Sequence, residues 1–122
     1  MMARTAKKAL SVFSPEETER LQGIYTGKGL SPKDIEEAKK ALRACLVAMS
    51  EYRHNCIVHK GSEFVIKGGM CMKIINESRA KLEDLKVMED RDFNWLTLLI
   101  FNKSQVLRHQ VIEEAVRRVI IV

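Results

Sequence analysis

The residues best suited to chemistry lie close together, between positions 52 and 60. Arg53, His54, Cys56 and His59 fall within one short stretch. A histidine titrates near neutral pH and can transfer protons, and an arginine can hold a phosphate through two parallel hydrogen bonds. Thiol and imidazole groups are also metal ligands. The stretch therefore suits either phosphate chemistry or metal binding.

The segment from Tyr52 to His59 resembles the arginine-to-histidine motif of the HEPN ribonuclease superfamily. Five residues separate Arg53 from His59, and the polar His54 follows the arginine. The resemblance implies a helical bundle that dimerises and cleaves RNA across the interface. It also implies that Arg53 stabilises the strained phosphate and that His59 acts as acid and base. The alternative is that a cationic His59 ends a helix, where the dipole favours it, and Arg53 is a solvated flank.

A metal site would have to use the cysteines and histidines of the same region. On a helix His54 and Cys56 point about 200° apart, so they cannot converge. Cys56 and His59 are three residues apart, and the following turn would have to bring Cys71 to them. That gives three candidate ligands without a fourth, and we expect no metal and no other cofactor. The alternative role for such cysteines is to fill small apolar spaces in a core.

Basic residues form a further candidate site. The chain has a net charge of +5, and positions 38–81 carry nine lysines and arginines against three acids. Counting heptads from Ile35 puts Lys39, Leu46, Arg53 and Lys60 on one edge of a long predicted helix, where the three cations could follow a phosphate backbone. The alternative is that their stems cover an apolar seam. The candidate nucleic-acid contacts are Lys39, Lys40, Arg43, Arg53, Lys60, Lys67 and Lys73.

Helices must position all of these side chains. Serine–proline pairs at Ser14 and Ser31 are typical of helix starts. Apolar residues from Ile35 to Cys56 recur at steps of three and four, which predicts a helix of about 25 residues reaching His59. A break is predicted near Asn102. The predicted helices cover about 15–26, 35–59, 70–89 and 92–122.

Three segments leave alternatives open. Phe64, Val65 and Ile66 lie between glycines and favour a short strand or an apolar plug. The apolar C-terminal residues are either buried in the fold, where they could pair with that strand, or they form an oligomer interface. Residues 1–13 form a basic arm that either orders on a partner or is a plain tail. The residues of the apolar end are Val119, Ile120, Ile121 and Val122.

The predicted fold is an all-α, four- to five-helix, bundle-like single domain over residues 14–122, with one long central helix and a two-strand appendage as an option. Hydrophobic residues make up 46% of the chain, which excludes a disordered or collagen-like protein. No apolar run reaches the roughly 18 residues of a membrane span, so no membrane partner is expected. Three cysteines without an export signal predict a reduced, cytoplasmic setting.

These features favour a small, basic, non-enzymatic binding protein over an enzyme. The expected partner is DNA, RNA or a nucleoprotein complex, because an excess of cations suits polyanions. We also expect a homo-oligomer or a place in a larger assembly. Two alternatives stay open: a protein-interaction adaptor or inhibitor whose charge is incidental, and a HEPN-like, metal-independent ribonuclease that uses Arg53 and His59.

Overall fold

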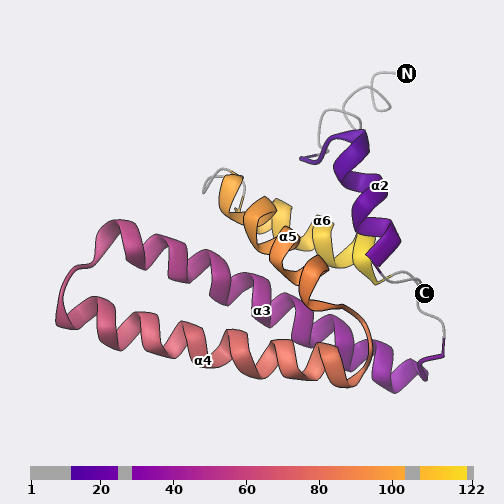
Figure 1. Ribbon diagram of the computed structural model, residues 1–122, viewed down its shortest axis with the longest axis horizontal. Helices are drawn as coiled ribbons and strands as arrows, with labels where there is room; N and C mark the ends of the chain where they lie inside the picture. The colour runs from indigo at the N-terminus through magenta and orange to yellow at the C-terminus, as the bar shows by residue number, and fades with distance from the viewer. Residues whose placement is uncertain (1–11, 25–28, 104–107, 121–122) are drawn as a thin grey trace.

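A computed structural model of the chain describes residues 12–24, 29–103 and 108–120. These residues contain five helices and no strand (Figure 1). The all-α class is therefore confirmed for the described part of the chain, in which no helix is long and apolar enough to cross a membrane. The helices are α2 (Pro15–Ile24), α3 (Pro32–Val58), α4 (Ser62–Asp84), α5 (Asp90–Asn102) and α6 (Arg108–Val119).

The serine–proline pairs begin α2 and α3, as predicted. Ser14 and Glu17 form a complete capping box: the Ser14 amide donates to Glu17 Oε1 at 2.8 Å, and the Glu17 amide donates to Ser14 Oγ at 3.1 Å. At the second start, the Asp34 amide donates to Ser31 Oγ at 3.1 Å. These bonds satisfy amides of the first turn, which have no partner within the helix.

Helices α3 and α4 form a long antiparallel hairpin (Figure 1). The long helix predicted from the apolar spacing is confirmed, since α3 has 27 residues and spans about 40 Å. Its predicted seam is buried from Ile35 through Met49. Gly61 joins the two helices with a φ of +63°, a left-handed conformation that favours glycine.

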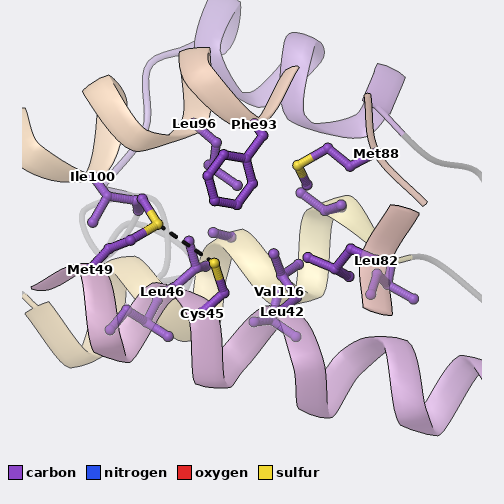
Figure 2. Packing of buried hydrophobic residues seen from close by; sticks show 14 of the residues in the cluster. Leu42, Cys45, Leu46, Met49, Leu82, Met88, Phe93, Leu96, Ile100 and Val116 are labelled. Carbon is purple, nitrogen blue, oxygen red and sulfur yellow. Dashed lines mark hydrogen bonds between the residues drawn. The ribbon is translucent and has the colours of Figure 1, made fainter. Parts of the chain in front are cut away.

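A second layer packs on the half of the hairpin that holds the ends Pro32 and Asp84. Figure 2 shows Phe93, Leu96 and Ile100 of α5 pointing toward Leu46 and Met49 of α3. Helix α6 lies against both α2 and α3 and adds Val116 to the same core. This core is almost entirely aliphatic and sulfur-bearing, with Phe13 and Phe93 as its buried aromatic residues.

Some element boundaries differ from the predictions. Residues 64–66, for which a strand or plug was expected, lie in the first turns of α4, which begins at Ser62 rather than near Met70. There the Phe64 ring packs on Tyr52 with centroids 5.8 Å apart, so the apolar segment finds a partner while staying helical. The predicted break is present, because α5 ends at Asn102 and α6 begins at Arg108.

The chain ends also differ from expectation. Phe13, which we had placed in the arm, is 5% exposed and belongs to the core, whereas residues 1–11 lie outside the described residues. Val119 and Ile120 are buried by the packing of α6, so these two side chains are tucked in and offer no exposed interface. Ile121 and Val122 lie outside the described residues.

Candidate functional site at the end of the hairpin

The half of the hairpin around Gly61 extends past the ends of α5 and α6 (Figure 1). We call residues 52–76 the hairpin end. Its two helices meet through small and polar groups. Asn55 Nδ2 donates to Cys71 Sγ at 3.6 Å, and Gly68 lies so close to Phe64 that a Cβ on it would be 3.4 Å from Phe64 Cζ. The interface between the helices here thus combines polar and small groups with the Tyr52–Phe64 ring pair and the buried Ile75.

Large apolar side chains are exposed on the hairpin end. The structure describes nine exposed large hydrophobic residues, and seven of them lie here. Four are among the most exposed, at 64% for Ile57, 69% for Val65, 65% for Ile66 and 64% for Met70. Clusters of this kind mark interaction sites, because leaving them in water is unfavourable. The seven are Ile57, Val58, Val65, Ile66, Met70, Met72 and Ile74.

Two of the seven predicted nucleic-acid contacts are engaged by carboxylates. Arg43 donates to the Glu113 carboxylate of α6 from Nε at 2.8 Å and from Nη2 at 3.1 Å. Lys67 Nζ lies 3.4 Å from Glu63 Oε1 and 3.3 Å from His59 Nε2. The other five make no hydrogen bond or ion pair with any residue that the structure describes. These are Lys39, Lys40, Arg53, Lys60 and Lys73.

The predicted basic edge of α3 is interrupted. Leu46 lies on that edge between Lys39 and Arg53, and it is completely buried in the core (Figure 2). The second layer therefore separates Lys39 from Arg53 and Lys60, which lie on the hairpin end. The edge is therefore not continuously cationic, and nucleic-acid contact by its exposed cations stays a prediction.

The two candidate catalytic residues have different surroundings. His59 caps α3 and turns toward α4: its Nδ1 lies 3.3 Å from Glu63 Oε1, and its Nε2 lies 3.3 Å from Lys67 Nζ. Arg53 lies about 120° around α3 from His59. Within the described residues no hydrogen bond or ion pair joins the two side chains, and the ribonuclease interpretation stays a prediction.

The candidate metal ligands do not converge. Within the described ranges, no three histidine, cysteine or acidic side chains are placed to hold an ion. Cys71 is buried between α3 and α4, where burial, with a contribution from Glu51, raises the pKa of its thiol. Cys56 is exposed and, with His59, lines a depression of about 340 Å³ at the turn. Cys56, His59 and Cys71 therefore do not form a ligand set.

An acidic cavity lies far from the hairpin end, and we did not predict it. It has a volume of about 740 Å³ and is lined by the end of α2 and the connection between α4 and α5. Among its lining residues, Asp90 is bound by Arg79, whose hydrogen bond holds the pKa of that carboxyl below its ordinary value. The acidic run over residues 83–92 was the available sequence signal.

The exposed apolar residues were also missed, although the sequence carries a signal for them. Ile57 and Val58 follow the end of the predicted seam, and Ile66, Met70 and Ile74 recur at steps of four off the buried face of α4. Counting apolar residues that the seam does not use would have found them.

No family model, curated protein or solved structure matches this chain. Evidence for its function therefore lies in the geometry of the chain itself.

Proposed function

We propose that this chain is a protein-interaction module, an adaptor or inhibitor, that binds its partner through the hairpin end. The observation that carries the proposal is the gathering of seven exposed large hydrophobic residues on one end of one hairpin. Full burial of one such side chain contributes about 1.5–3 kcal/mol. A partner that covered several of them would gain enough to offset part of the cost of association.

The charge of the hairpin end supports the same proposal. Between positions 52 and 76 there are four lysines and arginines and one acid, Glu63. Excess charge beside an apolar surface keeps the free protein soluble and disfavours association between copies. It also selects among partners, because complementary charge steers encounter.

The test is affinity capture from the native host with the full chain and two variants. Ile57→Ser/Ile66→Ser/Met70→Ser removes apolar surface from the hairpin end. Leu98→Ser is the matched control, because Leu98 is 63% exposed and lies on α5. We expect a defined protein, identified by mass spectrometry, that the control retains and the triple variant loses while its circular dichroism stays helical. Equal capture by all three proteins would overturn the proposal.

Nucleic-acid binding is the second candidate function. It is favoured by the five cations without a partner among the described residues, three of which, Arg53, Lys60 and Lys73, lie on the hairpin end. Each phosphate contact releases counterions, so three contacts predict a slope of roughly −3 in log K against log salt on duplex DNA. Fluorescence anisotropy with labelled DNA and RNA measures it. Absent binding at low salt removes this candidate.

A further inference from the structure

One side of the hairpin end continues the side of the hairpin on which α5 packs, mainly against α3. On α3, Leu46 is buried in the core that α5 covers, and Arg53 follows it seven residues later. Residues seven apart lie on nearly the same side of a helix. The row therefore passes from a buried leucine to a cation where α5 no longer covers it, and Lys60 adds a second cation in the turn just beyond the end of α3 at Val58.

The same change occurs along α4. Arg79 faces α5, because it binds Asp90 and lies 4.5 Å over the Phe93 ring. Met72 and Val65 precede Arg79 at steps of seven residues. This row also leaves the cover of α5 and ends in exposed apolar side chains.

The two rows together define the α5-side face of the hairpin end, with an apolar centre and no acid. Ile57 lies one turn beyond Arg53 and is 64% exposed, next to Val65 at 69% and Met72 at 39%. The two nearest acids in the sequence are already engaged, Glu51 by Arg108 and Glu63 by His59 and Lys67. The members of the α5-side face are Arg53, Ile57, Lys60, Val65 and Met72.

Helix α5 shows what kind of element packs on this side of the hairpin. It presents an apolar stripe of Phe93, Leu96 and Ile100 to the hairpin (Figure 2). Its first turn also carries Asp90, which binds a cation of the hairpin, Arg79. An amphipathic helix with an acid beside its apolar stripe therefore suits the part of this side that α5 leaves uncovered.

We propose that the α5-side face binds an acidic amphipathic α-helix of a partner protein, a proposal that rests on the proposed function and names the partner. The apolar stripe of that helix covers Ile57, Val65 and Met72. Its carboxylates pair with Arg53 and Lys60, as Asp90 pairs with Arg79. Helix-in-groove recognition of this kind combines apolar contacts with charge that fixes orientation.

Other occupants fit the face less well. Residues 1–11 contain three bases and no acid, so they carry the wrong charge. A second copy would bring its own Arg53 and Lys60 against these cations. Nucleic acid supplies anions but leaves the three apolar side chains without matching contacts.

The probe is a synthetic helix of about 20 residues with a leucine stripe flanked by glutamates, long enough to be helical alone. Its control is the same peptide with lysine in place of glutamate. Anisotropy titration should show saturable binding of the acidic peptide only, weakened by salt. Arg53→Glu/Lys60→Glu should reduce the affinity about tenfold or more. Lys33→Glu/Lys40→Glu, which changes the charge equally at the other half of α3, should leave it within about twofold, since a remote surface charge acts weakly.

Four outcomes would overturn this inference. The first is equal binding of the two peptides, and the second is equal loss in the two charge-reversal variants. The third is loss of peptide binding in Ile66→Ser with no loss in Arg53→Glu/Lys60→Glu. That result would place the binding site on the side of the hairpin end opposite to the α5-side face, and the proposed function would still hold. The fourth is binding of anionic phosphatidylglycerol vesicles or RNA, or a concentration-dependent dimer, in place of peptide binding. The capture experiment tests the proposed function separately.

Discussion

The two halves of the α3–α4 hairpin are built from the same two helices but have opposite surroundings. In the covered half, Leu42 and Leu46 of α3 are completely buried, and burial raises the pKa of the Cys45 thiol to about 12. In the hairpin end, Ile57 and Val58 of the same helix expose more than half of their surface. The sequence is apolar in both halves, so only the second layer of helices separates core from surface.

This difference indicates that the hairpin is longer than its own core requires. Helix α5 ends at Asn102, and what holds the helices together beyond it is a thin set of contacts such as the Tyr52–Phe64 ring pair. The part of the hairpin that extends past α5, with its exposed apolar side chains, adds little to the stability of the fold. It is better explained by contact with a partner, and the comparison can be tested in both halves.

The largest expected effect is a loss of stability in the covered half. Leu46→Ala should lower the free energy of unfolding by about 2–5 kcal/mol, because it removes buried contacts and leaves a cavity. Ile57→Ala, in the hairpin end, should change it by less than about 0.5 kcal/mol. Urea denaturation followed by circular dichroism measures both. Similar losses in the two variants would mean that the hairpin end is covered in the free protein.

The sequence predicted the covered half well and the hairpin end poorly. Regular spacing from Ile35 to Met49 identifies a buried helix face, because every member of that face packs on another helix. The same spacing continues to Cys56, which is exposed. Periodicity records which side of a helix is apolar, but whether another helix covers that side depends on where distant segments such as α5 end.

The predicted basic edge is interrupted for a related physical reason. A heptad count places Lys39, Arg53 and Lys60 on one edge but cannot show that Leu46 between them is buried. Likewise, the partner of Arg43 is Glu113, seventy positions away in the sequence. Long-range ion pairs of this kind have no local signature. The exposed apolar residues, by contrast, could have been found from the sequence.

Backbone opening should also differ between the halves. Amides of residues 52–57 and 68–76 should exchange with deuterium at least about tenfold faster than those of residues 38–49, because fewer buried contacts oppose local opening. Hydrogen exchange followed by mass spectrometry measures this in the free protein. Binding of a partner to the hairpin end should slow the fast set. Uniform exchange along α3 would contradict the comparison.

A glycine in the hairpin end offers a gain in stability. Gly69 lies inside α4, and a Cβ added to it would meet nothing within 4 Å, so Gly69→Ala should stabilise the protein by about 0.5–1 kcal/mol. Gly61→Ala has equally open space but a φ of +63°, and should be destabilising. Thermal unfolding of both variants measures the difference. If Gly69→Ala lowers the melting temperature as Gly61→Ala does, Gly69 has a conformational role that its helical position does not reveal.

The smallest expected effect concerns the ion pair that fastens the second layer to the hairpin. The hydrogen bonds from Arg43 outweigh burial and lower the pKa of Glu113 below its ordinary value of 4.5. The pair therefore stabilises the fold above that value, and the contribution is lost as the pH falls through the lowered pKa of the folded state. Both side chains are more than 40% exposed, so we expect about 0.2–1 kcal/mol near pH 7.

Glu113→Gln should therefore reduce the free energy of unfolding by that small amount near neutral pH. The difference from the unaltered protein should shrink as the pH falls below 4.5 and vanish below the lowered pKa of the folded state, where Glu113 is protonated in both states. Glu77→Gln, on the exposed surface of α4, is the matched control and should show no such convergence. Urea titrations at several pH values measure the free energy of unfolding of each variant. A constant difference at every pH would mean that Glu113 acts through packing rather than through its charge.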